Sequence, residues 1–339
     1  RGDKTMIAFG PVPSRRLGRS LGINNIPPKV CTYSCVYCQL GRTITMEMER
    51  RAFFEPEEVI QHVRDKVERA RGMGEAIDYL TFVPDGEPTL DLNLGREIED
   101  LSPLGIKTAV ISNGSLVWRE DVREALARAD WVSLKVDAAS PAMWRRVNRA
   151  HGSLRLDDIQ AGMVAFAEQY DGVLATETML VNGLNDGEDA VAEVAEFLSR
   201  LGADRAYLAI PTRPPAEPWA QGPNEETINR AFQIISERVD HVEYLIGYEG
   251  NEFTLTGDVE EDLLSITAVH PMREEAVDGF LERAGVGWDV VRDLVAEGQL
   301  IGAEYEGHPF YMRKLKGTRV GMEGGRDWEQ ADAGAGAIA

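Results

Sequence analysis

Three cysteines, Cys31, Cys35 and Cys38, lie within eight positions of this 339-residue chain, which contains no other cysteine. Thiolate is a soft ligand that suits zinc, copper(I) and iron–sulfur clusters, so the grouping predicts a metal site. A structural zinc site is normally closed by four protein ligands, often from two separated pairs. Because no second pair exists, we expect one coordination position to be filled by something other than cysteine. A zinc site and a purely structural iron–sulfur cluster are the alternative interpretations.

The composition is that of a globular chain with a large excess of acid. Hydrophobic residues make up 43% of it, and its length allows one large domain with a smaller appendage. The formal net charge of −21 opposes the binding of a polyanion, which requires clustered Lys and Arg. The charge therefore disfavours tRNA as a partner, and only a local basic patch would permit it.

The sequence gives no sign of a membrane segment or of a secretory route. No stretch approaches the roughly 20 apolar residues that a spanning helix needs, and residues 1–6 contain no apolar signal segment. Three neighbouring cysteines in an otherwise cysteine-free chain are typical of a reducing compartment and not of a disulfide framework. We therefore expect a cytoplasmic protein without membrane contact.

Short apolar runs alternate with amphipathic stretches between residues 20 and 246. The amphipathic stretches predict helices, and repeated strand–helix units of this length favour a parallel sheet with crossover helices. Six or seven units are too few for a closed eightfold barrel, so we predict an α/β fold, an open partial barrel of the (βα)6 type. The predicted strands are residues 20–24, 77–83, 107–111, 131–136, 173–181, 205–210 and 242–246.

Polar side chains follow these strands where each one ends. Ligands of parallel α/β folds bind beyond the carboxyl ends of the strands, so we expect these side chains to converge. Four arginines between positions 15 and 42 suit the recognition of a carboxylate. The strand-end residues are, in chain order, Asp85, Gly86, Glu87, Pro88, Thr89, Asn113, Lys135, Asp137, Glu177, Asn182, Asn185, Asp186, Arg213, Tyr248 and Glu249.

After about residue 252 the pattern changes to three short amphipathic helices and a hairpin, an order that resembles a winged helix-turn-helix domain. We therefore predict a core domain over residues 1–251, a winged-helix-like domain over 252–319 and a flexible acidic Gly/Ala-rich tail over 320–339. The segment in the position of a recognition helix, residues 288–297, carries three acids and one arginine, which disfavours DNA binding. Packing, dimerisation or substrate presentation are the other roles open to this domain.

Three segments together resemble one group within the radical S-adenosylmethionine (SAM) superfamily. They are residues 10–22, the Cys-x3-Cys-x2-Cys loop with Tyr37 before its last cysteine, and the Gly-Glu-Pro sequence at 86–88. The group comprises Fe–S oxidoreductases related to the wyosine-synthesising tRNA enzyme. The resemblance covers about residues 10–250 and implies a radical SAM partial barrel.

The resemblance also implies roles for site residues. Cys31, Cys35 and Cys38 would hold three irons of one [4Fe-4S] cluster, and SAM would chelate the fourth iron. Without the cysteines, the Gly-Glu-Pro segment would read as an ordinary turn, and a simple turn stays the alternative reading of Asn113 and Gly114. The implied SAM contacts are Tyr37 near the adenine, Gly86, Glu87 and Pro88 at the amino group, Asn113 near the methionyl or ribose part, and Lys135 near the carboxylate.

The chemistry that the resemblance implies begins with an external one-electron donor of the flavodoxin or ferredoxin type. SAM would be cleaved to methionine and a 5′-deoxyadenosyl radical, and the radical would remove hydrogen from a small-molecule or peptide substrate. The alternative reading of the candidate substrate contacts is as surface or turn residues. These candidates are Arg149, His151, Arg213, Tyr248 and Glu249.

Two other functions stay open. One is a tRNA-modifying enzyme of the wyosine-synthase type, but that type is expected to use a second cluster, and no cysteine is left here to bind one. The other is a regulator that senses redox state with its cluster and responds through the C-terminal domain. Cleavage of SAM separates the regulator from both enzymes.

Overall fold

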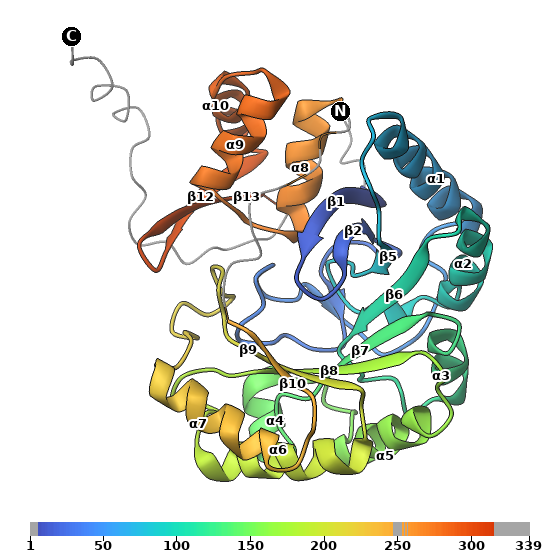
Figure 1. The fold of residues 1–339 in the computed structure, drawn as a ribbon, viewed down its shortest axis with the longest axis vertical. Helices are drawn as coiled ribbons and strands as arrows, with labels where there is room; N and C mark the ends of the chain where they lie inside the picture. Colours follow the sequence, from blue (N-terminus) through green and yellow to red (C-terminus); the bar gives the residue numbers. More distant parts are fainter. Residues whose placement is uncertain (1–5, 247–252, 254, 256, 315–339) are drawn as a thin grey trace.

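The computed structural model describes residues 6–246, 253, 255 and 257–314, and its centre is an eight-stranded sheet. The strand order is β1-β2-β5-β6-β7-β8-β9-β10. β1 pairs antiparallel with β2, and the remaining neighbours are parallel. Figure 1 shows the sheet curving, with α1, α2 and α3 along one flank and α5, α6 and α7 along the next, all on its outer side.

Six strand–helix units and a last strand form the parallel part of the sheet, which agrees with the predicted (βα)6 partial barrel. No helix in the described ranges is both long and apolar enough to cross a bilayer. The strands are β1 (Ala8–Ser14), β2 (Gly18–Ile23), β5 (Tyr79–Phe82), β6 (Lys107–Ser112), β7 (Trp131–Lys135), β8 (Val173–Met179), β9 (Arg205–Ala209) and β10 (Val242–Leu245), with the short pair β3 (Val30–Cys31) and β4 (Thr45–Met46) apart from the sheet. The helices are α1 (Pro56–Gly72), α2 (Leu94–Leu101), α3 (Glu120–Leu126), α4 (Pro141–Asn148), α5 (Leu156–Ala167), α6 (Glu188–Leu201) and α7 (Glu225–Ser236), with 3-10 turns at Pro88–Leu90 and Ser102–Leu104.

The first helix shows how the sequence positions these layers. Pro56 occupies the first turn of α1, where a backbone N–H would have no partner within the helix. Two acids in the same turn stabilise the helix by interacting with the positive end of its dipole. Val59, Val63 and Val67 recur at helical spacing and are fully buried. The helix therefore presents one apolar stripe to the sheet.

All seven predicted strands are present in the sheet, whereas β1 and α4 are not predicted by the sequence pattern. β1 contains Pro11 and Pro13, which read as loop residues. They are tolerated because β1 is an edge strand, whose outer backbone groups need no partner strand, and its register is irregular between Phe9 and Val12. α4 spans only two turns, too short for a clear apolar period.

The C-terminal unit contains three helices and a three-stranded sheet of order β11-β13-β12. The three helices and the hairpin agree with the prediction, and β11 is added. The tail predicted for residues 320–339 lies outside the described residues. The elements are α8 (Val259–Val269), β11 (Met272–Arg273), α9 (Glu274–Ala284), α10 (Asp289–Ala296), β12 (Leu300–Tyr305) and β13 (His308–Arg313).

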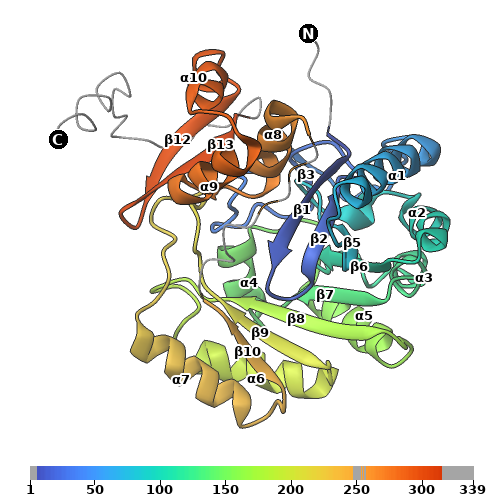
Figure 2. The ribbon, with the colours of Figure 1, turned by 45° about the horizontal axis from the view of Figure 1, so that its top comes forward.

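This C-terminal unit packs directly on the barrel. Phe9 and Val12 of β1 belong to the same hydrophobic cluster as Leu263 of α8, and Figure 2 shows α8 beside β1. Lys66 of α1 and Asp262 of α8 form a buried ion pair at 2.7 Å. The apolar core therefore continues across the boundary predicted at residue 252.

A buried acid in the barrel predicts a pH-dependent stability. Glu97 of α2 is fully buried, and burial together with the neighbouring Asp91 carboxylate raises its pKa. The folded chain thus holds this proton more tightly than the unfolded chain. The stability that this proton contributes is present at acid pH and is lost as the pH rises from about 4.3 through neutrality.

We expect Glu97→Gln to remove that loss. The variant should unfold at the wild-type temperature near pH 4.5 and several degrees higher at pH 8, since 1 kcal/mol corresponds to about 2–4 °C in domains somewhat smaller than this one. Thermal unfolding followed by circular dichroism at both pH values measures the difference. A difference that does not change with pH would contradict the raised pKa.

Candidate functional site

The three cysteines lie on one loop whose two ends pair with each other. Cys31 ends β3, which runs parallel to β4, so residues 32–44 form a closed excursion. Thr43 fastens it, because its Oγ1 donates to the Tyr33 carbonyl at 2.5 Å and its N–H donates to Ser34 Oγ at 3.2 Å. All three cysteines are free thiols. The loop geometry therefore depends on hydrogen bonds and not on a disulfide.

The C-terminal end of α4 holds the middle of this loop. The N–H groups of Ser34 and Val36 donate to the carbonyls of Asn148 and Val147, each at 3.0 Å. The Asn148 side chain also donates to Cys35 Sγ at 3.4 Å. A helix end from the far half of the barrel thus fixes the central cysteine.

The Gly-Glu-Pro segment at residues 86–88 packs against β3, next to the first cysteine. The Glu87 N–H donates to the Val30 carbonyl at 3.1 Å. A Cβ on Gly86 would lie 1.9 Å from that same carbonyl oxygen, much closer than any van der Waals contact. Glycine is therefore required here because the two backbones touch.

The Glu87 carboxylate fixes the end of β6. It is fully buried and accepts hydrogen bonds from Thr89 N–H at 3.1 Å, Thr89 Oγ1 at 2.5 Å, Ser112 Oγ at 2.7 Å and Asn113 N–H at 2.7 Å. Burial raises the pKa of Glu87, and these donors act in the opposite direction. The carboxylate therefore positions Asn113.

Asn113 in turn connects β6 to the first cysteine. Its side-chain N–H donates to Thr32 Oγ1 at 2.8 Å and to Cys31 Sγ at 3.5 Å. Its side-chain oxygen accepts a hydrogen bond from the Ser115 N–H at 2.9 Å. The structure thus brings the strand-end residues Glu87 and Asn113 together at the cysteine loop.

The donor set of the loop fits an iron–sulfur cluster. Burial raises the pKa values of Cys31 and Cys35, that of Cys35 to about 12, so these thiols require a coordinating metal to become thiolates at neutral pH. Cys35 and Cys38 are near enough to raise the pKa of Cys31 further. In the described part of the chain, however, no three metal-ligating side chains converge on a single ion. The fit therefore rests on the chemistry of the donors, because each thiolate of such a cluster binds a different iron.

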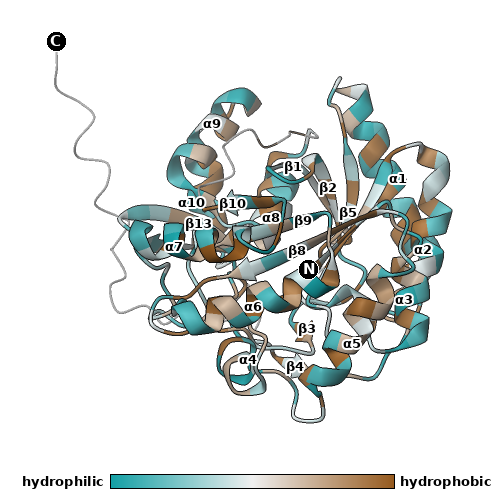
Figure 3. Ribbon diagram, turned by 60° about the horizontal axis from the view of Figure 1, so that its bottom comes forward, coloured by the Kyte–Doolittle hydropathy of each residue, from teal (hydrophilic) through white to brown (hydrophobic). Residues whose placement is uncertain are grey.

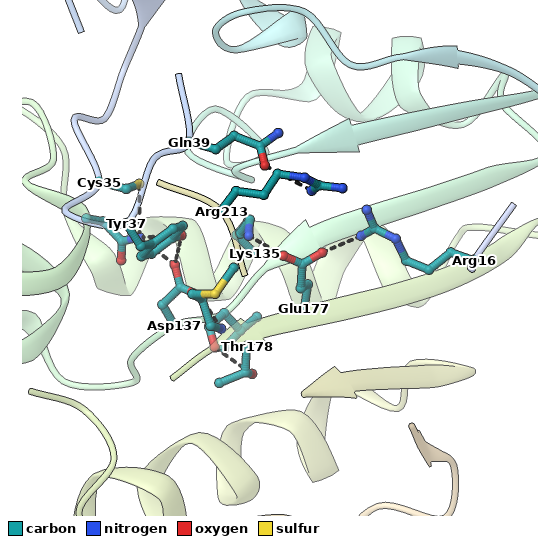
Figure 4. Close-up of polar contacts among 12 residues, drawn as sticks. Arg16, Cys35, Tyr37, Gln39, Lys135, Asp137, Glu177, Thr178 and Arg213 are labelled. Carbon is teal, nitrogen blue, oxygen red and sulfur yellow. Dashed lines mark hydrogen bonds and ion pairs between the residues drawn. The ribbon is translucent and has the colours of Figure 1, made fainter. Parts of the chain in front are cut away.

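A second group of residues joins the cysteine loop to the ends of β7 and β8 (Figure 4). The Tyr37 hydroxyl donates to the Asp137 carboxylate, and the Lys135 ammonium lies 5.0 Å from the centre of the Tyr37 ring. Lys135 pairs with one oxygen of Glu177, and Arg16 from the β1–β2 turn pairs with the other. The loop and the first hairpin are thereby connected through charged side chains.

The cations of this group keep Glu177 ionised. Burial opposes its ionisation, but Lys135 and Arg16 outweigh burial and lower the pKa of Glu177 to about 2. Burial also opposes the charge on Lys135, while Glu177 and Asp137 raise its pKa. Glu177 and Lys135 therefore both stay charged at physiological pH.

Glu177→Gln is expected to destabilise the fold, because it removes the carboxylate with which both Lys135 and Arg16 are paired. We expect a loss of about 2–3 kcal/mol, less than for a fully buried pair, since these two side chains keep 19% and 13% of their exposure. The double variant Lys135→Met/Glu177→Met removes both charges and should recover at least half of the loss. Urea unfolding at pH 7 measures both variants, and wild-type stability of the single variant would contradict the prediction.

A cavity of about 310 Å³ lies between the cysteine loop, the β1–β2 turn and the ends of the later strands. Pockets for small molecules begin at about this volume. Cys38 of the cysteine loop and His270 of the C-terminal unit both line it. The lining contains four Arg and Lys side chains and a single carboxylate, that of Glu177, in a chain whose net charge is −21. The cavity therefore favours anionic groups.

Arg213 is the predicted substrate contact that lines this cavity. Its guanidinium donates to Gln39 Oε1 at 3.1 Å and to His270 Nε2 at 2.8 Å. The side chain thus joins the cysteine loop to the C-terminal unit across the cavity wall.

The other predicted substrate contacts lie elsewhere. Arg149 and His151 follow α4 and are not among the cavity-lining residues. Arg149 pairs with Glu217, and the His151 N–H donates to the Thr32 carbonyl at 2.9 Å. The structure therefore places both beside the cysteine loop and away from the cavity. The two further candidates, Tyr248 and Glu249, lie outside the described residues.

Sequence reasoning found some of these residues and missed others. Asp137 and Glu177 are predicted only as polar residues near strand ends, and Arg16 only as one of four arginines. A stronger signal for Glu177 exists, because an acid inside the apolar run of β8 must be buried and must have cationic partners. Asn148 has no such signal, since it ends a short helix that the sequence pattern does not reveal.

Comparison with known proteins agrees with this geometry. The family model of the Radical SAM superfamily matches residues 25–198, about half of the chain, including the cysteine loop. The UPF0026 protein MJ1312 of Methanocaldococcus jannaschii is 47% identical over 312 residues, which cover 91% of this chain and 97% of the relative.

Two solved structures share the fold. A structure of TYW1 with a lysine-pyruvate adduct bound matches 65% of this chain and 74% of its own, with a TM-score of 0.52 at 18% identity. A radical SAM methyltransferase from Sphaerobacter thermophilus matches 67% of this chain and 66% of its own, with a TM-score of 0.51 at 17% identity. These two structures show the α/β partial-barrel fold, and the family match shows that the chain belongs to the radical SAM superfamily of SAM-dependent enzymes.

Proposed function

We propose that this enzyme binds one [4Fe-4S] cluster through Cys31, Cys35 and Cys38 and uses it to cleave SAM reductively. The observation that carries the proposal is the convergence of Glu87 and Asn113 on the cysteine loop, whose Cys38 lines the cavity. When bound, the cluster supplies one electron that splits SAM into methionine and a 5′-deoxyadenosyl radical, which abstracts hydrogen from the substrate.

The residues of the chain would hold SAM and exclude water. Tyr37 is buried and is the proposed neighbour of the adenine, and the backbone of Gly86 and Pro88 is the proposed wall beside the amino group. Asn113 is proposed to contact the methionyl or ribose part. Lys135, which lines the cavity, is the proposed partner of the SAM carboxylate. A closed site is needed because weaker C–H or S–H bonds outside the substrate would donate hydrogen to a carbon radical and quench it.

The cavity supports a small molecule, or a single side chain of a peptide, as the substrate. Arg213 is the proposed substrate contact, while Arg149 and His151 receive no support from the cavity lining. The order of helices and strands in the C-terminal unit supports a winged helix. We propose that this unit presents the substrate, because its His270 lines the cavity.

An external flavodoxin- or ferredoxin-like donor would supply the electron, and three free thiols support a reducing cytoplasm as the compartment. The alternative of a tRNA-modifying enzyme has only a likeness of fold to TYW1, and the net charge of −21 opposes it. Membership in an enzyme superfamily leaves the redox-sensing regulator without support.

Metal content and electron paramagnetic resonance test the cofactor proposal. After anaerobic reconstitution, we expect about four irons per chain and a spectrum of the reduced protein that changes when SAM fills the open coordination position. A zinc site would instead bind one ion and give no signal. Four irons with a spectrum indifferent to SAM would identify a structural cluster and refute the proposal.

A further inference from the structure

The helix that holds the cysteine loop lies in a basic stretch of an acidic chain. Between Asp137 and Asp157 the sequence has four arginines, one histidine and no acid, although the chain contains 57 acidic and 36 basic residues. Arg42, on the cysteine loop, adds a fifth guanidinium. We define the arginine surface as these five residues: Arg42, Arg145, Arg146, Arg149 and Arg155.

Most of this surface is open to solvent. The Arg42 and Arg155 side chains are 69% and 72% exposed, and Arg145 and Arg146 are exposed on α4. Arg42 and Arg149 pair with one carboxylate, that of Glu217. Arg155 pairs with Asp158 at 3.5 Å. Five guanidinium groups therefore face two paired carboxylates, and the surface remains positive.

Large apolar side chains are exposed on the segments that carry or adjoin these arginines. Ile44 and Met46 follow Arg42 on the cysteine loop and are 56% and 37% exposed. Trp219, two residues after Glu217, is 51% exposed. Arginine with exposed aromatic and apolar side chains is the composition of protein–protein interfaces.

The helix that carries Arg145 and Arg146, α4, is hydrogen-bonded directly to the cysteine loop. Val36 and Ser34 of the loop donate to the last two carbonyls of α4, and Asn148 donates to Cys35 Sγ at 3.4 Å. Figure 3 shows α4 beside β3 and β4 at one end of the molecule. A protein that binds here would therefore lie next to the cysteine loop.

The geometry points to the arginine surface as the docking site of an acidic flavodoxin that reduces the cluster, an inference that rests on the proposed function. One electron leaves the reduced flavin and enters the cluster, so the donor is oxidised by one electron and no atom is transferred. The net charge of −21 would repel an acidic carrier over most of the protein. At physiological salt, charges beyond about 8 Å are screened, so a local positive surface decides where the carrier docks.

The position of the surface favours an electron carrier over a nucleic acid. None of the five arginines lines the 310 Å³ cavity. An RNA bound there would not place a base in that cavity, whereas an electron only has to reach the cysteine loop. The donor needs proximity to Cys35, which this surface provides.

Charge reversal of Arg145 and Arg146 tests the inference. The matched control is Arg64→Glu/Arg71→Glu on α1, which changes the charge equally and also removes arginines bonded to backbone carbonyls. Calorimetric titration with oxidised flavodoxin, without SAM, should show affinity at least about tenfold lower for Arg145→Glu/Arg146→Glu than for the wild type and the control. The rate at which flavodoxin reduces the reconstituted Arg145→Glu/Arg146→Glu variant should fall by a similar factor. The rate of 5′-deoxyadenosine formation by this variant with dithionite should stay unchanged.

A charge-conserving double variant separates the loss of positive charge from misfolding of the charge-reversed variant. Arg145→Lys/Arg146→Lys should keep wild-type affinity for flavodoxin, and its affinity should fall as ionic strength rises. Equal flavodoxin affinity in the wild type and the reversed variant would overturn the inference. So would a reversal that abolishes tRNA binding and leaves flavodoxin binding intact. If dithionite yields no 5′-deoxyadenosine even in the wild type, the proposed function fails, and the titration still decides the docking site.

Discussion

Replacing Cys35 with Ala is expected to abolish both the iron–sulfur absorbance and the formation of 5′-deoxyadenosine. The substitution leaves two thiols in the chain, and both belong to the same loop. Loss of a residue that only supports a metal ligand costs about 10–100-fold in metal affinity, so loss of a ligand itself should cost more. Iron content after reconstitution and product analysis after addition of dithionite and SAM measure the effect.

The fold should survive this substitution. The loop is held by backbone hydrogen bonds from Ser34 and Val36 to α4, which do not involve the thiol. Circular dichroism should therefore match the wild type. Asn148→Ala is the graded control: it keeps all three thiols, removes the bond to Cys35 Sγ, and should lower iron affinity by about 10–100-fold. Full iron content and activity in Cys35→Ala would show that the ligand assignment is wrong.

Gly86→Ala is expected to disrupt the site by steric conflict alone. The added methyl would lie 1.9 Å from the Val30 carbonyl oxygen, so either β3 or the Gly-Glu-Pro segment must move. Overpacking against backbone costs about 3 kcal/mol, and the shift displaces Cys31 from Asn113. Urea unfolding and iron content should both fall well below the wild type.

Gly152→Ala is the matched control for this prediction. Gly152 lies in the segment after α4, beside the cysteine loop, and a Cβ there would meet nothing within 4 Å. The same change of residue should therefore alter stability by less than about 0.5 kcal/mol. If both alanine variants behaved alike, the close contact at Gly86 would not be the cause.

The alternation of apolar runs and amphipathic stretches is a sufficient signal for the barrel. Six of the seven parallel strands are short and largely buried, β10 being only partly so, and most of the helices between them have an apolar stripe, so local patterns agree with the fold. β1 has no such signal, because Pro11 and Pro13 are acceptable only at a sheet edge next to the C-terminal unit. Its place depends on long-range packing of Phe9 and Val12.

The candidate site also contains residues that the sequence predicts and contacts that it does not. The spacing of the three cysteines, together with Glu87 and Asn113 at strand ends, can be read along the chain, because parallel strands bring their carboxyl ends to one edge. Neither the bond from Asn148 to Cys35 nor the pairing of Arg16 with Glu177 can be read that way. Those contacts join residues far apart in sequence, and only the folded chain specifies them.

The most direct measurement is the anaerobic incubation of reconstituted protein with dithionite and SAM, with the products quantified by mass spectrometry. Equal amounts of 5′-deoxyadenosine and methionine are expected. Their formation should require reductant, SAM and Cys35 together. Absence of 5′-deoxyadenosine from protein that carries a full [4Fe-4S] cluster would contradict the central claim that this chain cleaves SAM.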